Sequence, residues 1–263
     1  MDSSIFKNHY GPAAVITGAS SGIGYAFAQR LAAIGFDLVL VARREDRLQQ
    51  LKQSLQQYHV KVQLCVADLT TESAVDAVFS ACQGMDIGLL VSNAGFGLKG
   101  AHQDNDPATM QRMLTVNCNA PMQLSHRFAP QLVARERSGI IITSSVEGLM
   151  GFPYSVPYAA SKAFTNSLAE GLWGELSPQG VDVLGLCPGS TDTEAHALQG
   201  IDQSKLEGMM SATEVASLAL ENITEGPIYI AGEQNQQMFA SITEMPRRDA
   251  LLMMAQTMQE SFK

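Results

Sequence analysis

The stretch Thr17-Gly-Ala-Ser-Ser-Gly-Ile-Gly24 lies between an apolar run at residues 13–17 and an amphipathic pattern that ends at Gly35. This order is typical of a strand, a glycine-rich turn and a helix that stops at a glycine. Taken alone, a glycine-rich turn is equally typical of an ordinary loop. Its place between strand and helix favours a dinucleotide site, because glycines allow a tight turn and the amides of a helix N-terminus bind a pyrophosphate. The residues predicted to form this site are Gly18, Ser20, Ser21, Gly22, Ile23 and Gly24.

Apolar runs and helical patterns alternate along the rest of the chain. We expect strands at residues 13–17, 37–41, 60–66, 87–91, 139–143, 181–187 and 228–230, and further helices at 44–58, 71–83, 107–134, 157–176 and 213–222. For the helix at 107–134 the alternative is a break near Ala120-Pro121. The strands are near-continuous apolar runs, as in sheets that are covered on both faces. The pattern therefore predicts an α/β fold with a parallel sheet, right-handed crossovers and helices on both sides.

The stretch 190–212 has no clean period and follows the end of the predicted strand 181–187. Ligands bind at the carboxyl ends of the strands in such sheets. We therefore predict a short substrate lid around residues 190–212. The alternative is an ordinary pair of surface helices.

Composition narrows the class of protein. The chain has 263 residues, of which 46% are apolar, and a net charge of −9. This length suits one α/β domain, or at most two small ones, and the negative charge argues against a nucleic-acid surface or adhesion to an anionic membrane. The four cysteines have no C-x-x-C spacing, the histidines have no metal-ligand spacing, and no apolar stretch reaches the ~18 residues of a membrane span. We expect a cytoplasmic protein with reduced thiols and no metal site.

The stretch Y-A-A-S-K places Tyr158 and Lys162 one turn apart on one face of a predicted helix. A neighbouring ammonium favours the phenolate and lowers the pKa of the phenol, so the pair can donate and accept a proton. Ser145 lies thirteen positions upstream, just after an apolar strand, where its hydroxyl could bind the same substrate oxygen. The alternative is a core tyrosine with a solvated lysine.

Together these motifs resemble the short-chain dehydrogenase/reductase family. The matching residues are 17–24, Asp68, Leu69, Asn93, Ala94, Gly95, Asn117, Ser145, Tyr158, Lys162, Pro188, Gly189 and Thr193, in the family's order over about residues 13–230. The resemblance implies a Rossmann-type doubly wound parallel sheet of about seven strands, in a single NAD(P)-binding domain that spans residues 1–263.

The resemblance also implies roles for individual residues. Tyr158 is the expected catalytic acid/base, and Lys162 is expected to lower its pKa and to hold the nicotinamide ribose. Ser145 would orient the substrate carbonyl, and Asn117 would complete a proton relay through water. The remaining expected cofactor contacts are Asp68 and Leu69 at the adenine, Asn93, Ala94 and Gly95 along the cofactor, and Pro188, Gly189, Thr191 and Thr193 at the nicotinamide end.

Some of these positions have plainer interpretations. Asn117 could bond only to backbone inside a helix, and Asn93 could be a turn residue ahead of Gly95. Ser144 competes with Ser145, and the family's thirteen-residue spacing to the tyrosine favours Ser145.

The cofactor is predicted to be NADP(H). The strand that starts at Asp37 ends in Ala42, where an NAD enzyme of this fold carries an acid for the ribose 2′-hydroxyl. Arg43 and Arg44 follow, and a guanidinium matches a phosphate with paired donors. The alternative is that both arginines are solvated at a helix start and pair with nearby acids, Glu45 or Asp46.

We therefore predict an oxidoreductase that transfers a hydride between NADP(H) and a carbonyl or secondary alcohol. The alternatives are a catalytically silent NADP-binding sensor or scaffold and an epimerase or dehydratase acting on a nucleotide sugar. A homodimer or homotetramer is expected through the helices at 107–134 and 157–176. The residues expected on the outer faces of these helices are Met113, Leu124, Phe164, Leu168 and Leu172, and the methionine-rich tail is expected in the core or at an oligomer interface.

Overall fold

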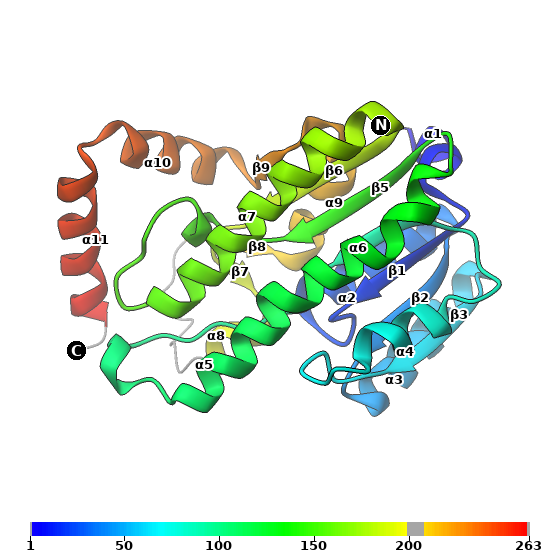
Figure 1. Ribbon diagram of the computed structural model, residues 1–263, viewed down its shortest axis with the longest axis horizontal. Coiled ribbons are helices and arrows are strands. Elements are labelled where there is room, and N and C mark those ends of the chain that lie inside the picture. The colour runs from blue at the N-terminus through cyan, green and yellow to red at the C-terminus, as the bar shows by residue number, and fades with distance from the viewer. Residues whose placement is uncertain (1, 199–207, 262–263) are drawn as a thin grey trace.

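The computed structural model describes residues 2–198 and 208–261 and is built around one seven-stranded sheet (Figure 1). The strand order is β3-β2-β1-β4-β5-β6-β9, and every neighbouring pair is parallel. The strands are β1 Ala13–Thr17, β2 Asp37–Ala42, β3 Val62–Val66, β4 Ile87–Ser92, β5 Ser138–Thr143, β6 Val181–Cys187 and β9 Ile228–Ile230. The order reverses between β1 and β4, where such sheets bind their ligands. The predicted doubly wound, Rossmann-type sheet is confirmed.

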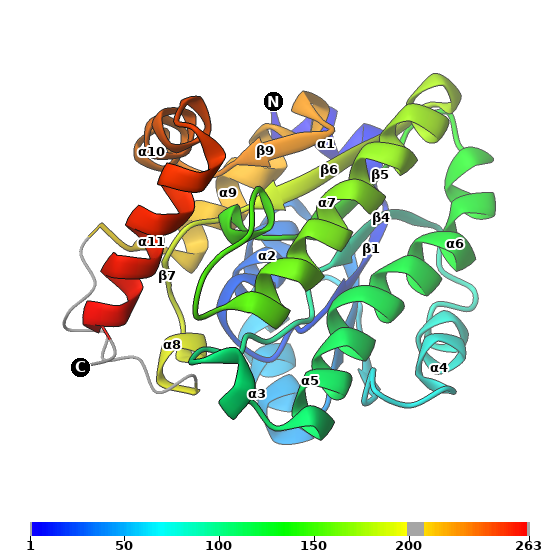
Figure 2. The ribbon, with the colours of Figure 1, turned by 60° about the vertical axis from the view of Figure 1, so that its left-hand side comes forward.

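Helices cover both faces of the sheet (Figure 1, Figure 2). One face packs against α1, α2, α3 and α9, and the other against α4, α6 and α7. The bounds of the helices are α1 Ser3–Tyr10, α2 Gly22–Ile34, α3 Glu45–Leu55, α4 Ala74–Ala81, α5 Pro107–Leu114, α6 Ala120–Val133, α7 Val156–Leu176, α8 Glu194–Leu198, α9 Ala212–Glu221, α10 Glu233–Glu244 and α11 Arg247–Ser261.

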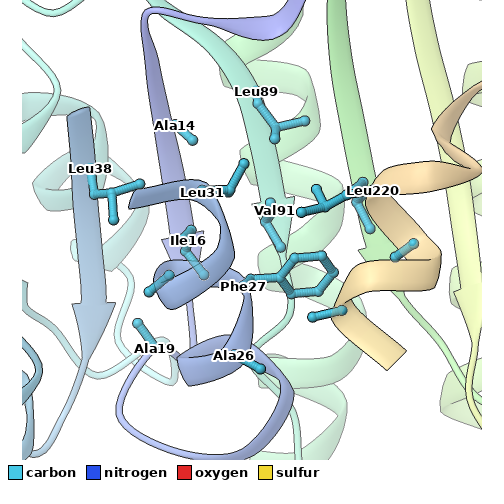
Figure 3. Packing of buried hydrophobic residues seen from close by; sticks show 14 of the residues in the cluster. Ala14, Ile16, Ala19, Ala26, Phe27, Leu31, Leu38, Leu89, Val91 and Leu220 are labelled. Atoms are coloured by element: carbon cyan, nitrogen blue, oxygen red, sulfur yellow. The ribbon is translucent and has the colours of Figure 1, made fainter. Parts of the chain in front are cut away.

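Successive strand residues enter opposite cores, which explains the continuous apolar runs. Ile16 of β1 lies in the core under α2, whereas Val15 lies in the core on the other face. Figure 3 shows Phe27 and Leu31 of α2 packed over the sheet near Leu220 of α9. Full burial of one such side chain contributes about 1.5–3 kcal/mol to the free energy of folding. Because both cores contain many of them, the helices on both faces stabilise the sheet and so fix the positions of the strand ends.

The predicted helix at 107–134 is three elements. α5 ends at Leu114, a π-helical turn occupies Thr115–Asn119, and α6 begins at Ala120. The π turn ends two residues before Pro121, which has no amide hydrogen for a helical bond. Its consequence is that Asn117 lies in the π turn, a distortion that often occurs at functional sites.

Several other predicted boundaries were too wide. The helix expected at 71–83 starts at Ala74, because the Asp68 carboxylate and backbone hold residues 70–71 in a turn. The strand expected at 60–66 starts at Val62, and the helix expected at 44–58 ends at Leu55 before a single 3-10 turn. The sequence did not predict α1, α10 or α11.

The expected outer face of the helices at 107–134 and 157–176 was wrong at two residues. Met113 and Leu124 are fully buried in the structure, while Phe164 is exposed and Leu168 and Leu172 pack partly against the core. Helical spacing alone does not say which stripe faces the sheet when the helix is apolar on more than one side.

The tail folds into α10 and α11, which Figure 2 shows beside the loop that precedes α7. Met254 packs with Met150 and Ala250 in a small separate core, whereas Met238 and Met253 are largely exposed. Among the residues that the structure describes, no helix is long and apolar enough to cross a membrane.

Candidate active site

The glycine-rich turn lies at the carboxyl end of β1, and two of its glycines have backbone conformations that other residues avoid. Gly18 has φ 69° and Gly22 has φ 54°. A Cβ on Gly24 would lie 2.3 Å from the Gly18 carbonyl oxygen and 2.6 Å from Asn93 Nδ2. Gly24 therefore allows α2 to pack closely against the turn, which is the role of the third glycine in a dinucleotide-binding turn.

Thr17 joins this turn to the end of β4. Its Oγ1 accepts hydrogen bonds from the amides of Asn93, at 2.9 Å, and Ala94, at 3.0 Å, and Asn93 Nδ2 donates to the Thr17 carbonyl at 3.2 Å. The predicted residues Asn93, Ala94 and Gly95 are thus held beside the glycine turn at the point where the strand order reverses.

Arg44 reaches over the same turn. Its Nη2 donates to Ser20 Oγ at 3.1 Å and to Ser21 Oγ at 2.8 Å, and it forms an ion pair with Glu194. The hydrogen bond to Glu194 raises the pKa of Arg44, and the bond from Arg44 lowers the pKa of Glu194. The sequence left open that Arg44 pairs with Glu45 or Asp46, but in the structure its ion pair is with Glu194.

Asp68 lies beyond the end of β3, near Arg43. The amide and hydroxyl of Thr70 donate to Asp68 Oδ1 at 3.0 and 2.9 Å. The Thr70 amide, more than the charge of Arg43, lowers the pKa of Asp68. Arg43 is exposed and Leu69 is buried, so this edge combines a cation, a carboxylate and an apolar side chain.

The four predicted catalytic residues come from three segments that meet beyond β4 and β5. Tyr158 and Lys162 lie on α7, Ser145 follows β5, and Asn117 lies in the π turn. Lys162 Nζ stands 5.6 Å from the centroid of the Tyr158 ring and donates to the Thr143 carbonyl at 2.8 Å. A Cβ on Gly95 would lie 3.0 Å from Asn117 Oδ1 and 3.4 Å from Lys162 Nζ, so Gly95 lies close to both.

Asn117 is bonded on both sides of its amide. Nδ2 donates to the Phe96 carbonyl at 2.9 Å and to Ser161 Oγ at 3.0 Å, and Oδ1 accepts from the Phe96 amide at 3.1 Å. The side chain therefore joins the loop after β4 to α7, one residue before Lys162. Backbone bonding, the plainer interpretation of this residue, is part of what it does.

The two neighbouring serines have different surroundings. Ser144 Oγ donates to the Lys162 carbonyl at 3.0 Å and accepts from Thr165 Oγ1 at 3.0 Å, which ties α7 to β5. Ser145 Oγ accepts from the Glu147 amide at 3.2 Å, and its hydrogen bond to Tyr158 lowers the pKa of that phenol. This difference supports Ser145 as the serine of the site.

Burial dominates the titration of the tyrosine and the lysine. It raises the pKa of Tyr158, and the charge of Glu147 raises it further, against the smaller effect of Ser145. Burial lowers the pKa of Lys162 to about 8. Burial and the charge of Glu147 thus act on the phenol in the same direction. That Lys162 lowers the pKa of Tyr158 stays a prediction.

The segment after β6 arches over the glycine turn. The Val146 amide donates to the Pro188 carbonyl at 3.1 Å, and Thr191 Oγ1 donates to the Gly189 carbonyl at 3.0 Å. A Cβ on Gly22 would lie 3.0 Å from the Thr193 methyl carbon, so Thr193 lies against the turn. Within the predicted lid, Thr191–Asp192 (β7) pairs with Met210–Ser211 (β8), and residues 199–207 lie outside the described residues.

Sequence reasoning missed several polar residues of this region. Glu194 pairs with Arg44, and Lys99 forms a buried ion pair with Glu147 at 2.6 Å beside Tyr158. A signal was present for Glu147, which is a charged residue two positions after Ser145 between buried neighbours. Nothing in the spacing of Lys99 points to this partner, because forty-eight positions separate the two.

Comparison with known proteins decides the family. A sequence model described as short chain dehydrogenase matches residues 12–203. The chain belongs to this family. It is 28% identical over 248 residues to a 7beta-hydroxysteroid dehydrogenase of Clostridium sardiniense, covering 94% of this chain and 95% of that protein.

Two solved structures of the family are similar along most of their length. A short-chain dehydrogenase from Sphingobium yanoikuyae in complex with NADPH has TM-score 0.82 and 33% identity, covering 92% of this chain and 95% of that one. A family member from Burkholderia phymatum in complex with NAD has TM-score 0.80 and 27% identity, with coverage of 90% and 94%. The chain is therefore an oxidoreductase of the short-chain dehydrogenase family, which binds a nicotinamide cofactor and acts on alcohol or carbonyl groups.

Proposed function

We propose that this protein interconverts a ketone or aldehyde and the corresponding alcohol with NADP(H), and that Tyr158 is its acid/base. The observation that carries the proposal is the convergence of Tyr158, Lys162, Ser145 and Asn117 beside the glycine-rich turn. When bound there, the nicotinamide supplies or accepts the hydride. The protein's part is to orient the substrate and to move one proton.

In the reduction direction, Ser145 donates a hydrogen bond to the substrate oxygen and Tyr158 gives its proton to the developing alkoxide. Because this proton is transferred to the substrate oxygen only in the transition state, Tyr158 should contribute to kcat rather than to substrate binding. Lys162 is held by the Thr143 carbonyl and has a pKa of about 8. A lysine with that pKa exchanges a proton near neutral pH, which supports its role in restoring the proton of Tyr158 through Asn117 and water.

The test of the acid is Tyr158→Phe. We expect it to abolish turnover while the dissociation constant of the cofactor stays within a few-fold, because the ring still packs. Tyr25→Phe, a change at a tyrosine 37% exposed on α2, is the control and should retain activity. Activity of Tyr158→Phe above about a hundredth of the wild-type value would overturn the assignment.

The NADP(H) preference rests on the end of β2 and on Arg44. Ala42, the last residue of β2, offers no acid to the ribose 2′-oxygen. The Arg44 guanidinium donates to the hydroxyl oxygens of Ser20 and Ser21 and also binds an anion, which in the structure is the Glu194 carboxylate. A phosphate would accept the same kind of charge-assisted hydrogen bonds from the Arg44 guanidinium.

The test is the dissociation constant of each reduced cofactor by fluorescence titration. Ala42→Asp with Arg43→Leu should weaken NADPH binding and improve NADH binding, because an acid repels the 2′-phosphate and accepts from the 2′-hydroxyl. The control, Lys52→Leu, removes an exposed cation from the last turn of α3 and should change neither constant. Wild-type protein that binds NADH as tightly as NADPH would refute the proposed preference.

A further inference from the structure

A buried ion pair stands next to the proposed acid and has no part in the chemistry described above. Lys99 lies in the loop after β4, and Glu147 lies in the 3-10 turn Val146–Gly148 after Ser145. Their side chains are 8% and 17% exposed, and Lys99 Nζ is 2.6 Å from Glu147 Oε1. Lys99 Nζ also donates to Ser155 Oγ at 3.0 Å and lies 5.8 Å from the centroid of the Tyr158 ring.

The two oxygens of the Glu147 carboxylate differ, because Oε1 is paired with Lys99. Oε2 is buried, and within residues 2–198 and 208–261 it has no hydrogen-bond partner. A buried carboxylate oxygen without a donor is unfavourable, so a donor on a ligand would stabilise it. The acceptor is held firmly, because the Glu147 amide donates to Ser145 Oγ at 3.2 Å and Lys99 holds Oε1.

Glu147 lies near the two residues that are proposed to bind the substrate. Ser145 and Tyr158 are the residues proposed to bind the reacting oxygen, and Glu147 is two residues from the first and acts electrostatically on the second. Lys99 Nζ, which is 2.6 Å from Glu147 Oε1, lies 5.8 Å from the centroid of the Tyr158 ring, so the ion pair stands beside that ring. We therefore infer that a substrate bound at Tyr158 has its neighbouring atoms on the side of Glu147. Lys99 does not offer a free cation to an acidic substrate, because Glu147 already neutralises it.

We propose that Glu147 is a specificity-determining residue, that its Oε2 accepts a hydrogen bond from a hydroxyl group of the substrate, and that the enzyme favours neutral hydroxyketones and diols over carboxylated ones. This inference rests on the proposed function, since it concerns the same site. A charge-assisted hydrogen bond discriminates for a substrate that has the hydroxyl, and the carboxylate repels a substrate that carries an anion in its place.

Three ketones test the proposal, because they share a methyl ketone and differ only in the neighbouring group. Hydroxyacetone carries a hydroxyl, butanone a methyl and acetoacetate a carboxylate. For wild type we expect kcat/KM to be about tenfold or more higher for hydroxyacetone than for butanone, and lowest for acetoacetate. In Glu147→Met the preference for hydroxyacetone should disappear and acetoacetate should gain about tenfold relative to butanone, because Lys99 is then a free cation.

The double variant Lys99→Met with Glu147→Met covers the case in which Glu147→Met alone does not fold. It should fold, because two apolar side chains of similar length replace the ion pair without leaving a charge unpaired. It should lose the preference for hydroxyacetone without the gain for acetoacetate. Glu170→Gln, a change at an exposed acid on α7, is the matched control and should keep the wild-type ratios. If the pair only braces the two loops, the double variant will change all three ketones by one common factor, and the proposal fails.

Binding separates this inference from the proposed function. In the Tyr158→Phe background the ketone is not consumed, and its dissociation constant is read from the fluorescence of bound NADPH. The same order of affinities, lost on Glu147→Met, supports the role of Glu147 even where turnover is slow. Equal affinities for the three ketones overturn it. Absence of NADPH or NADH oxidation by wild type with all three ketones would instead count against the proposed function.

Discussion

Replacing Thr17 with valine should separate the glycine turn from the loop after β4. Valine has nearly the same shape as threonine, but it lacks the oxygen that accepts from the amides of Asn93, at 2.9 Å, and Ala94, at 3.0 Å. Thr17 is fully buried, so water does not reach the vacated position without a rearrangement. The change therefore leaves two backbone donors without their acceptor.

Each buried donor that loses its partner costs about 1–3 kcal/mol. Because Asn93 and Ala94 are themselves only partly buried, we expect the lower part of that range and a total of about 2–4 kcal/mol. For a chain of this size a loss of about 3 kcal/mol lowers Tm by roughly 6–12 °C. The affinity for the cofactor should fall as well, because the loop that carries Asn93 is expected to line the cofactor.

The assay is urea unfolding followed by circular dichroism, together with the fluorescence titration of NADPH. Thr17→Ser is the control, because it keeps the oxygen and removes only a methyl group, and it should lose less than half as much stability as the valine variant. A valine variant within about 1 kcal/mol of wild type would show that these two bonds do not hold the crevice together.

Three further outcomes are expected. Gly24→Ala should weaken cofactor binding and cost about 1–3 kcal/mol of stability, because its Cβ would lie 2.3 Å from the Gly18 carbonyl oxygen; unchanged NADPH affinity in titration would contradict this. Lys162→Met should raise stability to urea below pH 8, and the gain should shrink between pH 8 and 10.5, because the folded pKa of about 8 lies below the ordinary 10.5 and the unfolded chain binds more protons in that window; a gain independent of pH would refute the reasoning. Glu194→Gln should tighten NADPH binding relative to NADH, because it frees Arg44 for the phosphate; equal effects on the two cofactors would argue against competition at this guanidinium.

The predicted oligomer has a similarly direct test. α5, α6 and α7 expose Leu114, Met122 and Phe164, which are 39%, 42% and 39% accessible. Exposed apolar residues on neighbouring helices are typical of an interface between subunits. Light scattering at micromolar concentration should therefore give the mass of a dimer or tetramer, and a monomer mass would count against the proposal.

The sequence predicted the sheet well because the physical signal is local and repeated. Every strand of a sheet covered on both faces is a short run of buried residues, as at Val15 and Ile16, and each run is followed by a turn. The glycine turn was predictable for the same reason, since Gly18 and Gly24 are required by backbone geometry that their spacing already implies.

The sequence predicted less where a distant partner decides the outcome. Arg44 was predicted to bind a phosphate, with Glu45 or Asp46 as the alternative partners, and its partner in the structure is Glu194, 150 positions away. Met113 and Leu124 were placed outside because a helix with two apolar stripes does not reveal which one faces the sheet. The direction of the pKa shift of Tyr158 depends on burial, which neighbours in the sequence do not report.

The way the candidate site is held suggests which of its properties are free to vary. Thr17 binds the loop after β4, the Thr143 carbonyl holds Lys162, and the Phe96 backbone holds Asn117. Thr17 and Thr143 are the last residues of β1 and β5, and Phe96 lies in the loop after β4, so the proton-transferring residues are positioned mainly by the sheet. Lys99 and Glu147 are held mainly by each other and by Ser155. We therefore expect substitutions in this pair to change which carbonyl compound is accepted, whereas substitutions at the strand ends should impair turnover of every substrate alike.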